Sequence, residues 1–224
     1  MGLFDKRKSR KRQRRECGGP VCYDENDCAA LEEYIGNTFG SFSNVFHEIV
    51  SPDIHVDIAV VEPNERFDGY TLVTMGMGAR RMNIPDDAPE SLAYVELAAY
   101  LPKDWNLKSG EESWYWPIRW LKLLARLPLN EDSWLGAGHT VANGGPFAED
   151  TALDSVLLID AIAPGNELVL PGGRKINFYT MVPLYEEESV YKQRYGAEAL
   201  LSLFEEKQLP FPPVIDKNRR NVCQ

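Results

Sequence analysis

Two histidines and an aspartate are the residues of this chain whose types best suit catalysis. His55 and Asp57 stand two positions apart in an alternating apolar run, so on a strand they would share one face. His139 lies in a glycine-rich segment from which it could approach them. Two imidazoles and a carboxylate can hold a metal ion or transfer protons, which makes a metal-dependent hydrolase one hypothesis. The chain has only three histidines and no His-x-x-His spacing, which favours the alternative that His55 and Asp57 hydrogen-bond to each other on a half-exposed sheet face.

The glycine-rich segment itself is a candidate binding surface. It runs from 135 to 145 and is followed by two acidic residues. Glycines let another chain approach the backbone closely, and long irregular segments often carry function. The alternative is a plain connection between a helix and a strand. The residues expected to contact a partner are Gly136, Gly138, His139, Thr140, Asn143, Glu149 and Asp150.

Two further patterns resemble a dinucleotide-binding loop and a zinc site, but neither is complete. The run Gly76–Arg81 begins like a dinucleotide-binding loop, but its third glycine is missing and Pro85 follows where the helix should run. Three cysteines are spaced C-x4-C-x5-C, which is not a usual zinc motif, and a fourth ligand would have to come from Cys223 or a histidine. We therefore expect free thiols and neither a metal nor a cofactor. The cysteines are Cys17, Cys22, Cys28 and Cys223.

The net charge of −10 conceals two opposite parts. Residues 1–15 hold eight bases and one acid, so the rest of the chain carries −17. An acidic body of this kind suits a basic protein partner. The arm from Lys6 to Arg15 is expected to be a disordered tail, with a nucleic-acid, anionic-lipid or nuclear-import arm as the alternative. No apolar residue is interleaved there, and the longest apolar runs are far below the ~20 residues of a membrane span. We expect a cytoplasmic protein without membrane contact.

Hydrophobic periodicity predicts one α+β domain with a mostly antiparallel sheet and packed helices. The domain should cover residues 29–224, after a basic arm at 1–28. Helices are expected from an Asp27 cap towards Gly40, over 116–127 with Pro117 in the first turn, and over 185–207 with a break at Gly196. Strands are expected over 45–50, 54–61, 70–75, 93–101 and 155–159, followed by a hairpin of 167–170 with 175–183.

Five tryptophans lie between 105 and 134. Trp120 falls on the apolar stripe of the central helix and should be buried. Trp114 and Trp134 flank that helix and are candidates for an exposed partner-binding ridge, because tryptophan is enriched at interface hot spots.

Several segments together resemble the Suppressor-of-fused family, in its compact bacterial type. The resemblance covers roughly residues 29–223 and rests on the order of the segments. They are His55–Ile58, Tyr70–Met77, Trp116–Pro128, Gly138–Gly144, Phe178–Leu184, Gly196–Leu201 and the terminal Asp216–Arg220, which is similar to a D-x-x-R ending.

The resemblance implies a non-catalytic protein-binding domain. In bacteria the family is associated with polymorphic toxins, which implies an immunity protein or antitoxin that neutralises a toxin such as a nuclease. In animals it sequesters a transcription factor, and the partner peptide adds as a strand between two domains. The open alternatives are the hydrolase of His55, Asp57 and His139, and a regulatory protein that sequesters a nucleic-acid-associated partner, with the basic arm as a tether to nucleic acid.

Overall fold

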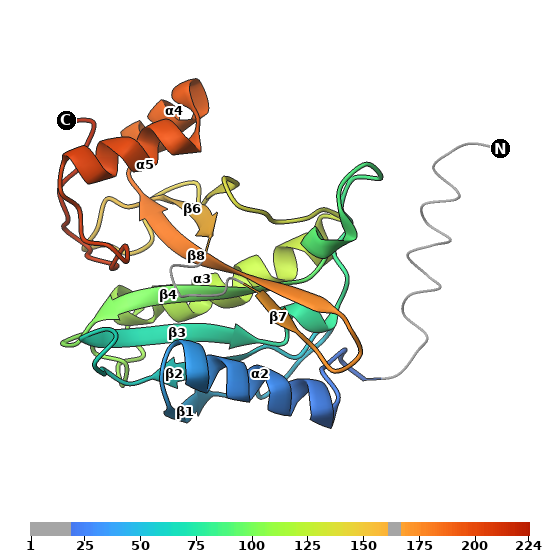
Figure 1. The fold of residues 1–224 in the computed structure, drawn as a ribbon. Coiled ribbons are helices and arrows are strands. Elements are labelled where there is room, and N and C mark those ends of the chain that lie inside the picture. Colours follow the sequence, from blue (N-terminus) through green and yellow to red (C-terminus); the bar gives the residue numbers. More distant parts are fainter. Residues whose placement is uncertain (1–18, 161–166) are drawn as a thin grey trace.

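The structure is a computed structural model that describes residues 19–160 and 167–224, and its centre is one mixed sheet (Figure 1). The strand order is β1-β2-β3-β4-β8-β6-β5, and β7 pairs with β8 off this path. The strands are β1 (Phe42–Phe46), β2 (Asp57–Val61), β3 (Gly69–Met75), β4 (Val95–Pro102), β5 (Thr140–Ala142), β6 (Ser155–Asp160), β7 (Glu167–Val169) and β8 (Lys175–Leu184). The predicted α+β fold with a mostly antiparallel sheet is confirmed.

The sheet changes its pairing at β8. Strands β1 to β4 form an antiparallel meander, whereas β4 and β8 are parallel and pair only over Val95–Ala98 and Asn177–Thr180. Beyond that point β8 continues alongside β6, with Tyr179–Leu184 opposite Ser155–Asp160. Over Ala99–Pro102, strand β4 therefore keeps β3 on one side but loses β8 on the other, and the sheet opens on that side.

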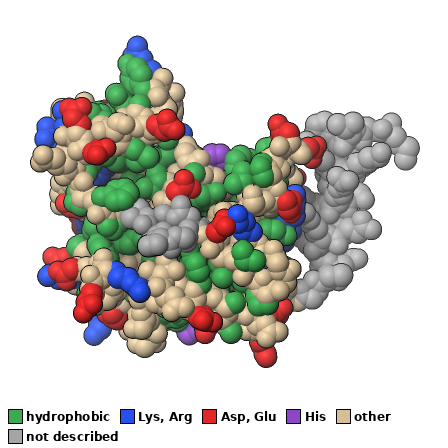
Figure 2. All heavy atoms as spheres, in the orientation of Figure 1, with side chains coloured by type: hydrophobic (Ala, Val, Ile, Leu, Met, Phe, Trp, Pro, Cys, Tyr) green, Lys and Arg blue, Asp and Glu red, His purple; other side chains and the backbone are tan. Residues whose placement is uncertain are grey.

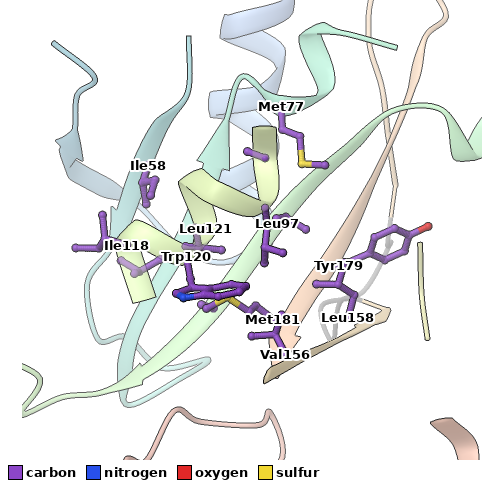
Figure 3. Close-up of a cluster of buried hydrophobic side chains, with 14 of the residues drawn as sticks. Ile58, Met77, Leu97, Ile118, Trp120, Leu121, Val156, Leu158, Tyr179 and Met181 are labelled. Atoms are coloured by element: carbon purple, nitrogen blue, oxygen red, sulfur yellow. The ribbon is translucent and has the colours of Figure 1, made fainter. Parts of the chain in front are cut away.

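Helices cover both faces of the sheet. Alternation along β2 sends Ile58 and Val60 to one face and Ala59 and Val61 to the other. The helix α3 (Glu112–Asn130) packs on the first face, where its buried side chains meet β4, β6 and β8 (Figure 3). The helix α2 (Glu25–Thr38) packs on the second, in front of the sheet in Figure 1.

A smaller lobe follows the last strand. The helices α4 (Glu186–Tyr195) and α5 (Ala197–Glu206) meet at Gly196, whose φ of 93° ends the first helix. Leu200 and Phe204 of α5 pack on the outer part of β6 and β8 and on Val222 near the chain end. This confirms the predicted break of the last helical region. Two short 3-10 helices, η1 (Met77–Ala79) and η2 (Glu90–Leu92), lie between β3 and β4.

Three local expectations are wrong. The cap of α2 is Asp24, which accepts from the N–H of Asp27, and Asp27 itself pairs with Arg174. The strand expected at 45–50 ends at Phe46, because the following loop is held by side-chain contacts described below. Pro117 lies inside α3, since packing of the buried Trp116 extends the helix back to Glu112.

The chain is already docked on the sheet before residue 29. Val21 bridges to Ile54, and the Tyr23 hydroxyl donates to Glu96 Oε1 at 2.8 Å. The basic residues 1–15, and with them the expectation of disorder, lie outside the described residues. No described helix is both long and apolar enough to cross a bilayer.

Candidate partner-binding site

The opening between β4 and β8 forms a cleft of about 1380 Å³. Its walls are the end of β4 with the start of α3, the outer half of β8, and the chain from α5 to Asn218. In Figure 2, hydrophobic side chains lie between the α4–α5 lobe at upper left and the body of the sheet, with acidic side chains around them. The apolar walls include Trp105, Trp114, Pro183, Phe204 and Phe211.

The C-terminal segment, residues 210–219, crosses this cleft beside β4. Val214 forms a parallel bridge with Tyr100, and the N–H of Ile215 donates to the Tyr100 carbonyl at 2.8 Å. Ile215 is buried in the core of the α3 face. The segment thus supplies one strand-like contact where the sheet has lost β8, and the rest of the opening stays accessible.

Lys217 ties this segment to the start of α3. Its Nζ lies 2.7 Å from Asp150 Oδ2, 3.6 Å from the centre of the Trp114 ring and 5.1 Å from that of Trp105. Burial acts to raise the pKa of Asp150, but the hydrogen bond and charge of Lys217 outweigh it and lower the pKa. The Lys217 carbonyl also accepts from Thr151 Oγ1 at 2.7 Å. These contacts hold the ammonium by ion pairing and cation–π attraction.

Arg219 forms a second, deeper tie. Glu188 of α4 is fully buried, and its Oε1 accepts from Arg219 Nη1 at 2.7 Å while Oε2 pairs with Nη2. The same carboxylate accepts from the N–H groups of Tyr185 at 3.1 Å and Val222 at 3.0 Å. Arg219 Nη2 also donates to the Pro183 carbonyl at 2.8 Å. The terminal D-x-x-R pattern therefore places its arginine in a buried bidentate pair.

The cleft keeps an excess of negative charge. Both cations on its lining are neutralised, Lys217 by Asp150 and Arg219 by Glu188. Among the residues that the structure describes, no salt bridge neutralises the remaining acids of the lining. These acids are Asp104, Asp160, Glu205 and Asp216. A lining that combines apolar and acidic side chains fits a basic segment that carries apolar side chains.

The predicted glycine-rich surface lies at the far sheet edge, and its first half is packed. A Cβ on Gly136 would lie 2.5 Å from the Trp134 ring, and the Gly138 N–H donates to Leu158 at 2.7 Å. The His139 ring contacts Trp134 edge-on with 4.4 Å between centres. Burial and the charge of Lys192 lower the pKa of His139. Thr140 begins β5, whose outer side is an edge of the sheet.

In the second half of that surface, Asn143, Glu149 and Asp150 have different surroundings. Asn143 Nδ2 donates to the carbonyls of Gly145 at 2.7 Å and Pro146 at 3.1 Å, which stabilises the turn. Glu149 is exposed. Asp150 reaches the cleft through Lys217. Of the seven predicted residues, Asp150 alone lines the cleft.

The structure does not bring together the predicted cluster of His55, Asp57 and His139. His55 precedes β2 and His139 precedes β5, and five strand spacings of about 4.8 Å separate these strands. His139 thus does not reach Asp57. Asp57 Oδ1 instead lies 3.1 Å from His55 Nε2, and Oδ2 lies 2.9 Å from His47 Nδ1. His55 and Asp57 are thus in contact, although His55 lies before β2 and not on the strand. Within 19–160 and 167–224, no group of three or more His, Cys, Asp or Glu side chains is placed to hold a metal ion.

Ser51 completes a contact series that resembles a hydrolytic triad. Its Oγ lies 2.8 Å from His55 Nδ1, but it also donates to Glu48 Oε2 at 2.7 Å. Burial acts to raise the pKa of Glu48, whereas hydrogen bonds from Ser51, Val56 and Arg126 outweigh it and lower the pKa. The hydroxyl has one proton, and Glu48 accepts it. The Ser51 proton is thus directed at Glu48 and not at His55, and these contacts fasten the loop.

Sequence reasoning missed the residues that build the cleft. Lys217 and Arg219 lie in the terminal segment that carries the family resemblance, but their partners are 67 and 31 positions away. Glu96 was also missed: it is fully buried and accepts from Tyr23, Thr74 and the N–H groups of Gly76 and Gly78. The two glycines once considered for a phosphate loop thus donate to a carboxylate of the same chain.

Comparison with known proteins agrees with this architecture. The family model of the Suppressor of fused protein matches residues 52–220. The chain belongs to the Suppressor of fused family. Its fold is similar to a putative Suppressor of fused homolog from Neisseria gonorrhoeae, with a TM-score of 0.59 and 16% identity over 89% of this chain and 96% of that one. No curated protein matches the sequence.

Two further structures of the family share the fold. A chain of the Sufu–Fu complex matches with a TM-score of 0.68 and 14% identity over 91% of this chain and 93% of that one. Drosophila Suppressor of Fused matches with a TM-score of 0.56 and 13% identity over 87% of this chain, and the match spans 50% of the Drosophila chain. The family is one of protein-interaction domains, and the Sufu–Fu structure is itself a complex of two proteins.

Proposed function

We propose that this chain is a non-catalytic cytoplasmic protein that neutralises a basic toxin, such as a nuclease, by binding a segment of it in the cleft. The observation that carries the proposal is the cleft itself, whose lining combines apolar and acidic side chains. Nuclease sites are basic because they hold phosphate, so an acidic surface can occlude them. The charge of −17 on residues 16–224 supports a fast encounter with such a partner.

The open stretch of β4 supports the mode of binding. Only Tyr100 of this stretch is bridged by the C-terminal segment. An extended peptide can add its backbone to such an edge while side chains enter the apolar walls. A cytoplasmic location is supported by the free thiols of Cys22, Cys28 and Cys223, since a reducing compartment keeps thiols unpaired.

The experiment first identifies the partner by pull-down from the native host and then compares two sets of variants. Asp104→Lys with Glu205→Lys reverses two exposed charges of the cleft. Glu65→Lys, in the turn between β2 and β3, is the matched control. We expect the cleft variant to weaken binding at least tenfold, about 1.4 kcal/mol, through the association rate and less at high salt. The control should bind as the wild type does.

The glycine-rich surface remains a competing location for the partner. His139→Ala with Glu149→Lys tests it. Asp150 stays unchanged, because its reversal would break the tie to Lys217. If this variant weakens binding tenfold and the cleft variant does not, the partner sits on the β5 edge and the cleft assignment is wrong.

The toxin assignment has its own test. Co-expression of this chain should protect cells from the identified partner, and the cleft variant should protect them less. A partner that is harmless when expressed alone would refute the neutralising role while leaving protein binding intact. A transcription regulator or another nucleic-acid-associated protein among the captured partners would support the regulatory alternative.

A further inference from the structure

The cleft holds two cations of its own chain with the same combination of groups, an aromatic ring and a carboxylate. Lys217 pairs with Asp150 and has its Nζ 3.6 Å from the centre of the Trp114 ring. Arg219 pairs with Glu188, and its guanidinium carbon lies 5.0 and 5.3 Å from two ring centres. A cation in such a position is attracted by the ring face and by the negative charge together. The rings beside Arg219 are those of Tyr185 and Phe204.

Another ring of the cleft lining, that of Phe211, lies in water. Its side chain is 73% exposed, and among the large apolar side chains of the described residues only Ile49 and Val50 are more exposed. In the same part of the chain, no lysine or arginine lies over the Phe211 ring. Large aromatic side chains are enriched at the centres of protein interfaces, so an exposed one on a binding cleft is a candidate contact for the partner.

The end of α5 brings a carboxylate close to this ring. After α5 the chain turns back, and the N–H of Leu209 donates to the Phe204 carbonyl at 3.0 Å. It then descends towards the sheet at the left of Figure 1. Phe211 follows Leu209 by two positions, which is at most about 7 Å of chain. Glu205, the neighbour of Phe204, is exposed and lines the same cleft, so the ring and the carboxylate belong to one turn at its edge.

The charge of Glu205 is not neutralised by a cation of the described chain. The nearest base in the sequence, Lys207, pairs with Glu206 at 3.2 Å. The two cations of the cleft lining, Lys217 and Arg219, are held by carboxylates of their own. Phe211 and Glu205 are therefore the same two kinds of group that hold Lys217, and no cation within 19–160 and 167–224 uses them.

Prolines on both sides of Phe211 restrict its position. Pro210 and Pro212 each have a φ that is fixed by the pyrrolidine ring. Further along, Val214 is bridged to Tyr100 of β4, which fastens the segment to the sheet. A segment with so few accessible conformations loses little entropy when a partner binds to it.

We propose that Phe211 and Glu205 bind an arginine side chain of the partner, with its guanidinium stacked on the ring and paired with the carboxylate. The inference rests on the proposed function and specifies which side chain of the basic segment enters the cleft at this point. Arginine suits the site better than lysine, because a planar guanidinium stacks on a ring and can donate two N–H groups to a carboxylate at the same time.

The test uses two synthetic peptides that differ in one charge. One is acetyl-Leu-Ser-Arg-Ser-Leu-amide, and in the other the arginine is replaced by citrulline, which is neutral and has nearly the same shape. In an extended peptide the leucines and the arginine share one face, so they can enter the cleft together. Nuclear magnetic resonance titration of the full chain measures both dissociation constants, and the indole N–H signal of Trp114 reports binding in the cleft.

Two variants remove one group of the site each, Phe211→Leu and Glu205→Gln. Their matched controls, Tyr195→Leu and Glu65→Gln, change exposed residues outside the cleft lining. Circular dichroism establishes that each variant is folded.

We expect the wild type to bind the arginine peptide about fivefold more tightly than the citrulline peptide, as an exposed cation–π contact and an exposed ion pair together would give. Phe211→Leu and Glu205→Gln should each remove most of this preference, and both controls should keep it. Equal affinity of the wild type for the two peptides, a preference that survives Phe211→Leu, or binding of neither peptide would overturn the proposal. The cleft assignment is judged separately, by partner binding in Asp104→Lys with Glu205→Lys, so either proposal can fail alone.

Discussion

Loss of the Arg219 charge should be one of the most damaging single changes on the cleft wall. Arg219→Met keeps most of the side-chain volume and removes the guanidinium. Glu188, which is 0% exposed, would then keep only two N–H donors and no cation. Removing one partner of a buried ion pair costs about 3–5 kcal/mol, because the other charge is left uncompensated. With a typical total of about 5–15 kcal/mol, the variant would lose a large part of its free energy of unfolding.

Removing both charges should cost much less. In Arg219→Met with Glu188→Leu no buried charge remains, and apolar side chains replace the pair in a site lined by Phe204 and Val222. Replacing a buried pair by apolar residues of similar size is often neutral or stabilising. The double variant should therefore be at least about 2 kcal/mol more stable than Arg219→Met alone, a coupling that a double-mutant cycle isolates.

Urea unfolding measures these differences, provided that the slope m is unchanged between variants. Arg81→Met is the control, because Arg81 also makes a bidentate pair, with Glu90 at 2.8 and 2.7 Å, but both side chains are exposed. Its free energy of unfolding should match that of the wild type. If Arg219→Met is no more destabilising than Arg81→Met, then Glu188 is solvated and the C-terminal segment is not locked as described.

Four further predictions concern other parts of the molecule. Burial acts to raise the pKa of Asp57, but hydrogen bonds from the Glu48 N–H and His47 and the charge of His55 lower this pKa overall. The ionised Asp57 therefore stabilises the fold above the unfolded pKa of about 3.9, and this stabilisation is lost as the pH falls through the lower folded pKa. The urea midpoint of Asp57→Asn should depend less on pH below about 4 than that of the wild type, and equal slopes would contradict this prediction. Gly76→Ala should lower the free energy of unfolding by at least about 3 kcal/mol, because φ is 134° and the new Cβ would lie 1.9 Å from the His55 carbonyl oxygen. The control Gly172→Ala, whose new Cβ has no heavy atom within 4 Å, should have the melting temperature of the wild type. Deletion of residues 2–15 should leave the melting temperature within a few degrees, and a larger fall would show that the arm docks on the fold. Elemental analysis of untagged protein should find no stoichiometric zinc or manganese; one equivalent that is lost in His55→Ala would reverse that expectation.

Local sequence patterns were sufficient for most of the secondary structure. The alternation of apolar residues at 54–61 predicts a strand, and β2 covers its second part, Asp57–Val61. The residue types of the turn at 171–173 predict the β7–β8 hairpin, which the structure has. The break at Gly196 is equally local, since a φ of 93° is open mainly to glycine. The charge contrast between arm and body is likewise a property of composition.

Contacts between distant segments followed from the tertiary structure alone. The sequence suggested that His139 lies beside His55 and Asp57, but the strand order places it five strands away along the sheet. In the structure, His47 contacts Asp57 and Ser51 contacts His55, both from the loop between β1 and β2. Glu96 looked like one polar position in an apolar strand. It is satisfied because Tyr23, 73 positions earlier, is brought to it by the packing of α2 and its preceding segment.

The cleft is the clearest case of a feature that no local pattern encodes. It exists because β8 leaves β4 after four paired residues to follow β6, and because the last residues of the chain return across the opening. Hydrophobic periodicity specifies which face of a strand is buried, but it does not specify which strand becomes its neighbour. The choice of neighbour depends on how two helical layers fit on one sheet, and only the folded chain decides it.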